Sequence, residues 1–271
     1  MTGSRTRKLP KLGRRHKMVP MSTPLLVVED LAHTYPDGTK ALQGLALQVH
    51  PGEIVAVIGL SGAGKSTLLR CINGLLRPSR GRVWFDRREV RWDAASLRTL
   101  RRDVGMVFQQ FNLIGNLSVL TNVLLGRLSY QRAWMQPLYR FRAEDRRIAA
   151  SALAKVGLLG EWHKPASELS GGQQQRVGVA RALAQEPRLL LADEPVSSLD
   201  PLTADAVLGH FVAVVREEKL AALMNLHSVN LARKYSDRVV GVRDGRVVWE
   251  GEPDGLTIAA LKDVYGAEYV E

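Results

Sequence analysis

The 271-residue sequence predicts an α/β fold with a parallel core sheet, an antiparallel β subdomain and an inserted helical subdomain. Continuous apolar runs at 54–58, 189–192 and 221–226 are typical of parallel strands buried on both faces. A glycine-rich loop follows the first run and leads into a helical pattern. Residues 117–167 are helical in character, which predicts a helical insertion within the α/β core.

The composition is that of a globular chain, with 45% hydrophobic and 24% charged residues. No apolar run approaches the roughly 20 residues that a transmembrane helix needs, so we expect any membrane role to depend on a partner protein. The single cysteine, Cys71, excludes an internal disulfide and fits either a small buried residue or a redox sensor. No linker divides the chain, so one domain is expected at 23–255, followed by a C-terminal tail at 256–271.

The net charge of +11 is concentrated at the N-terminus, where seven Lys and Arg residues and no acidic residue precede Met18. They account for more than half of the net charge, and no apolar stretch typical of a secretory signal accompanies them. We interpret residues 1–22 as a basic disordered arm, with binding to anionic lipid headgroups as the functional alternative. Translation could also begin at Met18 or Met21.

The remaining elements follow from local patterns and turn residues. Asp37-Gly38 and Asp244-Gly245 each predict a turn between two short strands, and Pro78 with Gly81 marks a break after a helix. The expected elements in chain order are strands at 25–28, 45–49 and 54–58, a helix at 65–75, strands at 83–85 and 104–108, helices within about 115–170, a helix at 177–184, strands at 189–192 and 221–226, and a closing hairpin at 239–240 and 247–248.

The glycine-rich loop has the spacing of a phosphate-binding loop and lies between a strand and a helix, as that function requires. Glycines let backbone N–H groups point at phosphates, Lys65 can reach the β and γ oxygens, and Ser66 can offer its hydroxyl to Mg²⁺. The alternative is a glycine-rich turn with an incidental lysine. The residues predicted to bind nucleotide here are Gly59, Ser61, Gly62, Ala63, Gly64, Lys65, Ser66 and Thr67.

Two adjacent carboxylates end the apolar run at 189–192. Asp193 and Glu194 would lie at the carboxyl end of a strand, where ligands collect in open α/β sheets. We predict that Asp193 holds Mg²⁺, through water, and that Glu194 is the general base for an attacking water. A solvated strand end is the alternative, and the phosphate-binding loop disfavours it.

The third motif is Leu169-Ser170-Gly171-Gly172-Gln173, followed by a helical pattern. A serine hydroxyl and glycine N–H groups at a helix start can bind an anion, although an ordinary helix cap has the same residues. Here the chain resembles the ABC ATPases, whose signature is Leu-Ser-Gly-Gly-Gln. The resemblance covers about 25–250 and implies a P-loop NTPase core of ABC ATPase type. It also implies a homodimer closed head to tail, in which Ser170, Gly171, Gly172 and Gln173 bind the ATP of the partner subunit.

Four further positions are similar to functional positions of that family. Tyr35 resembles the aromatic residue that stacks on adenine, with core packing as the alternative. Gln109, rather than Gln110, resembles the glutamine that contacts Mg²⁺ and the attacking water beside the membrane partner. Asp200, in the Ser197–Asp200 stretch, is expected at the dimer interface. His227 resembles the histidine that binds the γ-phosphate, although a histidine at a strand end is often structural.

The helical subdomain narrows the subfamily by resemblance. Residues 117–128, which end in Leu-Leu-Gly-Arg-Leu, together with Trp134 and residues 226–232, are similar to the ATPase subunits of phosphonate importers. This implies an ATP- and Mg²⁺-dependent subunit at the cytoplasmic face of the cell membrane, bound to permease subunits that receive substrate from a periplasmic or extracellular binding protein. The alternatives are an importer for amino acids or phosphate, an exporter-type ATPase, or an ABC ATPase acting on nucleic acid. No nucleic-acid partner is expected, because the chain has neither a long coiled coil nor two ATPase halves.

Overall fold

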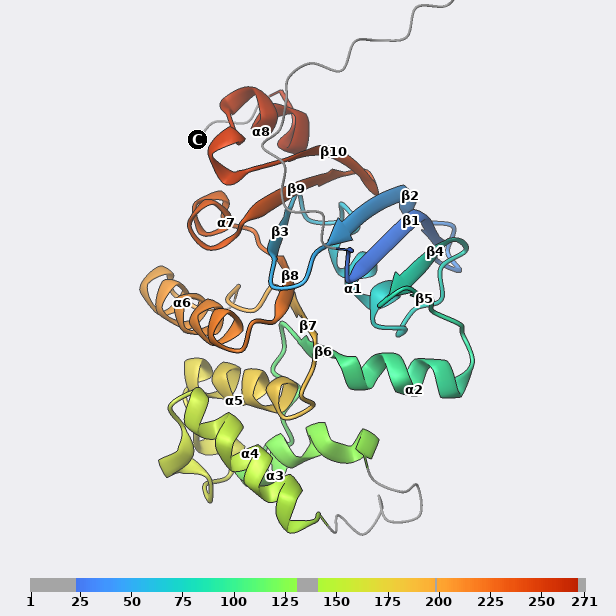
Figure 1. The fold of residues 1–271 in the computed structure, drawn as a ribbon. Helices are drawn as coiled ribbons and strands as arrows, with labels where there is room; N and C mark the ends of the chain where they lie inside the picture. Colours follow the sequence, from blue (N-terminus) through green and yellow to red (C-terminus); the bar gives the residue numbers. More distant parts are fainter. Residues whose placement is uncertain (1–22, 131–140, 198, 268–271) are drawn as a thin grey trace, which may run out of the picture.

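The computed structural model describes residues 23–130, 141–197 and 199–267. The predicted basic arm at 1–22 and Trp134 lie outside the described residues. Two sheets share the upper part of the molecule, and a group of helices forms its lower part (Figure 1). The α/β fold class predicted from the sequence is confirmed.

The smaller sheet is antiparallel and has four strands in the order β2-β1-β4-β5. Its buried positions alternate with exposed ones over part of each long strand, so one face packs on the core. Asp37 accepts a hydrogen bond from the Thr39 N–H at 2.9 Å in the turn between the first two strands. The strands are β1 (Leu26–Thr34), β2 (Lys40–Val49), β4 (Arg80–Phe85) and β5 (Arg88–Glu89).

The larger sheet has six strands in the order β10-β9-β3-β8-β7-β6. All pairs are parallel except the closing hairpin of β9 and β10. Every residue of β3, β6, β7 and β8 is buried, as their continuous apolar patterns predict. The strands are β3 (Ile54–Ile58), β6 (Val104–Val107), β7 (Leu189–Asp193), β8 (Ala221–Asn225), β9 (Arg238–Arg243) and β10 (Arg246–Gly251).

Helices connect these strands, and several of them begin at side-chain caps. Asp93 accepts hydrogen bonds from two backbone N–H groups at the start of α2, and Asp200 accepts one at the start of α6, where Pro201 follows. Helices α2, α6 and α7 were not predicted from the sequence. The helices are α1 (Lys65–Ile72), α2 (Ala94–Asp103), α5 (Gly171–Leu183), α6 (Pro201–Glu217) and α7 (Val229–Tyr235).

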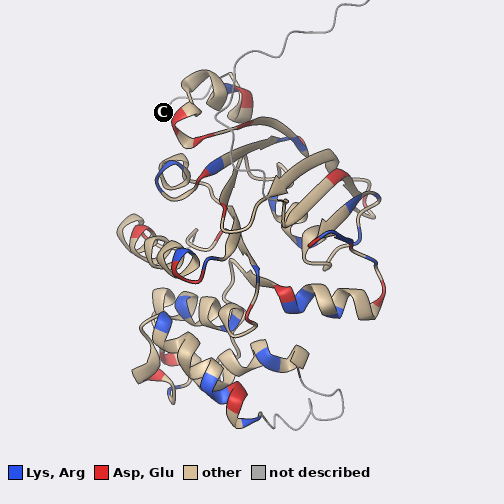
Figure 2. Cartoon of the chain, viewed as in Figure 1, with Lys and Arg blue, Asp and Glu red and all other residues tan. Residues whose placement is uncertain are grey.

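The lower helices form the region predicted as a helical insertion. Helix α4 carries both acidic and basic residues in its first turns (Figure 2). The elements are α3 (Val119–Leu124), α4 (Ala143–Lys155) and the short 3₁₀ segments η1 (Leu125–Tyr130), η3 (Leu159–Glu161) and η4 (Ala166–Glu168).

The predicted C-terminal tail differs from the structure. Residues 256–265 are part of the fold: after η5 (Pro253–Gly255), α8 (Ile258–Tyr265) packs on the hairpin of β9 and β10. Leu261 and Val264 are fully buried. Gly241 in β9 leaves room for this helix, since a Cβ there would lie 2.3 Å from Val264 Cγ2. Helix α8 has only eight residues, so its apolar pattern was too short to reveal a helix.

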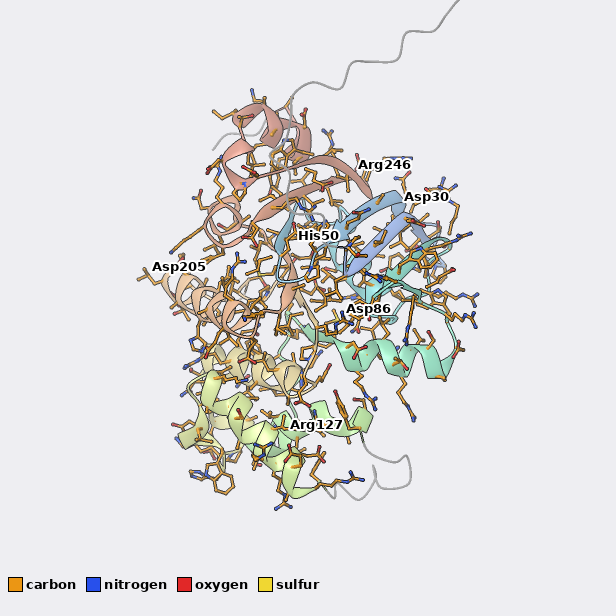
Figure 3. The ribbon with its side chains drawn as sticks, in the orientation of Figure 1. Asp30, His50, Asp86, Arg127, Asp205 and Arg246 are labelled. Carbon is orange, nitrogen blue, oxygen red and sulfur yellow. The ribbon has the colours of Figure 1, made fainter. Side chains whose placement is uncertain are left out.

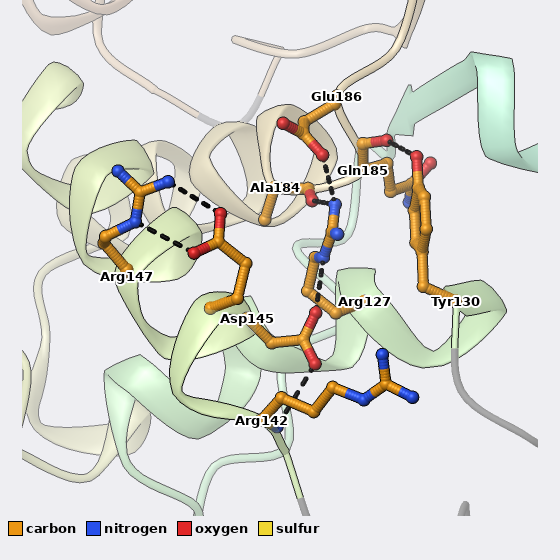
Figure 4. Close-up of polar contacts among 9 residues, drawn as sticks. Arg127, Tyr130, Arg142, Asp145, Arg147, Ala184, Gln185 and Glu186 are labelled. Carbon is orange, nitrogen blue, oxygen red and sulfur yellow. Dashed lines mark hydrogen bonds and ion pairs between the residues drawn. The ribbon is translucent and has the colours of Figure 1, made fainter.

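A buried arginine ties the helical region together (Figure 4). Arg127, whose side chain is 6% exposed, donates to Asp145 Oδ1 at 3.0 Å and to Glu186 Oε2 at 2.7 Å. It also donates to the Ala184 carbonyl at 2.9 Å and lies over the Tyr130 ring. Arg127 therefore joins η1 to the start of α4 and to the end of α5, and Figure 3 shows it among the side chains of this region.

We predict that Arg127→Met destabilises the chain by about 3 kcal/mol, because it leaves the buried Asp145 carboxylate without its charged partner. The measurement is the free energy of unfolding in urea. The control is Arg147→Met, whose exposed pair with Glu144 should contribute less than about 1 kcal/mol. Similar losses for the two variants would contradict the role assigned to Arg127.

Candidate nucleotide-binding site

The glycine-rich loop connects β3 to α1, and two of its glycines are required by the backbone. Gly59 has φ of +152° and Gly64 has φ of +102°. A Cβ at Gly59 would lie 2.1 Å from the Val242 carbonyl oxygen, and one at Gly64 would lie 2.3 Å from the Ala41 carbonyl oxygen. Any side chain at either position would displace the loop from the closing hairpin or from β2.

Lys65 lies inside the curve of this loop. Lys65 is 4% exposed, and its ammonium group donates to the carbonyls of Gly59 at 2.8 Å and Leu60 at 2.9 Å. Burial lowers the pKa of Lys65, whereas the charges of Glu194 and Asp193 raise it. The loop thus holds a cation close to two carboxylates.

The structure brings together two of the three side chains predicted as Mg²⁺ ligands, Ser66 and Asp193. Ser66, near the start of α1, donates its hydroxyl to Asp193 Oδ1 at 2.8 Å. The same oxygen accepts a hydrogen bond at 2.8 Å from the side-chain amide of Asn225, which is fully buried at the end of β8. Asp193 and Asn225 are register partners in the parallel pair of β7 and β8.

Asn225 was not among the predicted site residues. The available signal was a single amide at the end of an otherwise apolar strand, in the strand that neighbours the one carrying Asp193. Strand order cannot be read from one sequence, so the signal could not be connected to the site.

Glu194 and His227 meet in the structure, although 32 residues separate the ends of their strands. His227 Nε2 lies 2.5 Å from Glu194 Oε1, with side-chain exposures of 45% and 13%. Glu194 has φ of +51°, a left-handed conformation that costs a non-glycine residue on the order of 1 kcal/mol. This turn directs the chain away from β7 directly after Asp193.

Tyr35 and Gln109 occupy the edges of this region. The half-buried Tyr35 lies beside α1, with its hydroxyl 3.1 Å from Thr67 Oγ1 and its ring edge-on to His33. Gln109 and Gln110 are exposed in a bend after β6. Because β6 is the parallel neighbour of β7, Gln109 lies at the same sheet edge as Asp193.

The Leu-Ser-Gly-Gly-Gln motif forms a different surface. Ser170 caps α5 by accepting the Gln173 N–H at 3.3 Å, and the Gln173 side chain accepts the Ser170 N–H at 2.9 Å. A cavity of about 890 Å³ lies between the starts of α5 and α6. Its lining includes Ser170, Gly171, Gly172, Gln173, Asp200 and Leu202.

This cavity is separate from the phosphate-binding loop, because no residue of 59–67 lines it in the described part of the chain. Leu202 is 86% exposed beside the cavity, and hydrogen bonds from Thr203 lower the pKa of Asp200. Ser198, in the predicted interface stretch, lies outside the described residues. The Leu-Ser-Gly-Gly-Gln motif and the glycine-rich loop therefore lie on two separate surfaces of the chain.

The chain is similar in sequence to known proteins. Residues 42–197 match the family model described as ABC transporter. The Phosphonates import ATP-binding protein PhnC of Bdellovibrio bacteriovorus is 46% identical over 248 residues, which are 91% of this chain and 95% of that protein. PhnC 2 of Haloarcula marismortui is 46% identical over 89% of each chain.

Solved structures agree with the sequence relatives. The chain resembles cbiO1 from Clostridium perfringens, part of the ABC transporter complex cbiONQ, with a TM-score of 0.76 and 32% identity over 89% of this chain and 92% of that one. It also resembles the ATP-binding cassette MJ0796, in a dimeric post-hydrolysis state bound to ADP and Pi, with a TM-score of 0.73 and 33% identity over 85% of this chain and 99% of that one. Together with the loop, the paired carboxylates and the signature motif, these likenesses show that the chain belongs to the ABC transporter family, among its ATP-binding proteins.

Proposed function

We propose that this chain is the ATP-hydrolysing subunit of an importer that takes up phosphonates through a separate permease. The observation that carries the ATPase activity is the convergence of Lys65, Asp193 and Glu194 at one sheet edge. The substrate class is supported by relatives named phosphonates import ATP-binding proteins, at 46% identity over most of both chains.

The donor set fits a magnesium nucleotide. The hydroxyl of Ser66 and the carboxylate of Asp193 are hard oxygen donors, which Mg²⁺ prefers, and Gln109 could add an amide oxygen. In the described residues, no group of three or more His, Cys, Asp or Glu side chains could hold a metal alone. This suits an ion that is shared with nucleotide phosphates and water. Mg²⁺, when bound, would offset the charge of the phosphates.

The phosphates and the adenine of the nucleotide would bind to different elements of the chain. Residues 59–67 would surround the phosphates with N–H groups, and the Tyr35 ring would stack on the adenine. The Lys65 ammonium would exchange its loop carbonyls for the β and γ oxygens.

Hydrolysis needs one base and one positioning group near the γ-phosphate. Glu194 would accept a proton from water as the water oxygen bonds to the γ-phosphorus. The bond from that phosphorus to the bridging oxygen breaks, and ADP leaves with the electron pair. His227, already in contact with Glu194, would donate a hydrogen bond to the phosphate.

The site would be completed by a second copy of the chain. The signature residues face a cavity apart from the phosphate-binding loop, so they could contact ATP only across an interface with a partner copy. The exposed Leu202 beside this cavity supplies an apolar contact for such an interface. The dimeric MJ0796 cassette, similar over 85% of this chain, supports the arrangement.

The membrane role would come from partners. No helix within the described ranges is long and apolar enough to cross a bilayer. We propose that permease subunits bind near Gln109 and the helical subdomain, that they hold the ATPase at the cytoplasmic face of the membrane, and that a substrate-binding protein delivers the phosphonate to them.

We predict that Glu194→Gln retains ATP binding, lowers turnover by at least about 100-fold and accumulates an ATP-bound dimer, because the amide cannot accept the proton of water. Single-turnover hydrolysis and size-exclusion chromatography with Mg²⁺ and ATP measure this. Glu252→Gln, at an exposed position remote from the site, is the control. Full turnover by Glu194→Gln would overturn the assignment of the base.

We also predict that a binding protein loaded with an alkylphosphonate stimulates ATP hydrolysis in vesicles that contain the cognate permease. Lys65→Ala should abolish the stimulated activity, because it removes the cation that contacts the phosphates. Stimulation by phosphate or an amino acid in place of phosphonate would contradict the proposed substrate and leave the ATPase assignment standing.

A further inference from the structure

Arg181 connects α5, the helix that begins at the signature motif, to residues 109–112, which follow β6 and are called the Gln109 segment below. It lies in the last turn of α5, and its guanidinium donates to the Asn112 carbonyl at 2.6 Å and to the Phe111 carbonyl at 2.9 Å. Burial lowers the pKa of Arg181. A half-buried guanidinium that donates to two successive carbonyls favours one position of their backbone, because both charge-assisted hydrogen bonds can form only there.

Phe111 also lies beside α5 at two glycines of that helix. A Cβ at Gly171, the first residue of α5, would lie 3.9 Å from the Phe111 ring, and one at Gly178 would lie 3.9 Å from the Phe111 carbonyl oxygen. Asn112 has φ of +49°, a left-handed conformation that asparagine tolerates better than most residues. The backbone thus turns at Asn112, where Arg181 holds it.

The other side of this last turn is fixed to the helical region. A Cβ at Gly126 would lie 2.3 Å from the Arg181 carbonyl oxygen, and Arg127 donates to the Ala184 carbonyl. The Gly-Arg pair of the Leu-Leu-Gly-Arg-Leu stretch therefore holds the end of α5. Its 13 residues form a rod about 20 Å long, with Ser170 at one end and Arg181 near the other.

We propose that Arg181 is a positioning residue that transmits movement of α5 to the Gln109 segment. When a partner subunit's nucleotide engages Ser170, α5 moves as a rigid rod, and Arg181 moves residues 111–112 with it. This inference rests on the proposed function, because it assumes that nucleotide binds at the signature motif. The position of Gln109 would then depend on two nucleotides: the chain's own, which Gln109 contacts directly, and the partner subunit's, which acts through α5 and Arg181.

Hydrogen–deuterium exchange of the full chain, with Mg²⁺ and a non-hydrolysable ATP analogue, separates the direct effect of nucleotide on Gln109 from the effect transmitted by Arg181. Gln109→Ala removes the direct contact, and it is compared with the double variant Gln109→Ala/Arg181→Met. In Gln109→Ala alone, nucleotide should slow exchange at 110–114. In the double variant this effect should fall by about tenfold or more, because hydrogen bonds from a charged donor are lost. Protection at 59–67 and 168–175 should remain in both.

The control is Gln109→Ala/Arg216→Met, since Arg216 also lies in the last turn of a helix and donates to a main-chain carbonyl, that of Gly52. It should retain the slowing at 110–114. Arg181→Lys, which keeps the charge without the planar pair of donors, replaces Arg181→Met if that variant does not fold, with the same loss expected. Equal slowing with and without Arg181, or none in Gln109→Ala, would overturn the inference. Absence of protection at 59–67 in the unaltered chain would instead contradict the proposed function.

Discussion

The site depends on four parallel strands, β3, β8, β7 and β6, that end at the same edge of the larger sheet. Each strand delivers a different group there: the glycine-rich loop, His227, the two carboxylates and Gln109. Side chains alternate between the two faces of a strand, so a shift of one residue between β7 and β8 would move Asn225 away from Asp193. The buried apolar residues of these strands set that register, and they thereby set the geometry of the polar groups.

The polar cluster around Asp193 is ordered because its buried groups must be hydrogen-bonded. A buried carboxylate is costly unless its oxygens are satisfied, and Asp193 receives hydrogen bonds from Ser66 and Asn225 while Lys65 lies close by. The same constraint acts at Arg127, whose bonds fix the helical region to the end of α5. The molecule thus contains two preorganised polar clusters, and α5 contacts both the helical region and strand β6.

The sequence was sufficient for what is local. The glycine-rich loop, the paired carboxylates after an apolar strand and the capped Ser170 motif each have their determinants within a few residues, and the structure places each at the predicted strand or helix end. Asn225, Arg127 and Arg181 have partners 18 to 70 residues away, which no local pattern shows. Helix α8 was missed because its stability comes from contacts with β9 and β10 rather than from a long amphipathic pattern.

The central claim is that each ATP site is built from two copies of the chain, and mixing two inactive variants tests it most directly. Lys65→Ala disables the phosphate-binding loop, and Gly171→Asp places a negative charge at the signature motif. Neither variant alone should hydrolyse ATP. The account predicts that their mixture regains activity, because a heterodimer contains one site with an intact loop and an intact signature. No activity in a mixture shown to contain heterodimers, or full activity of Gly171→Asp alone, would contradict the shared site.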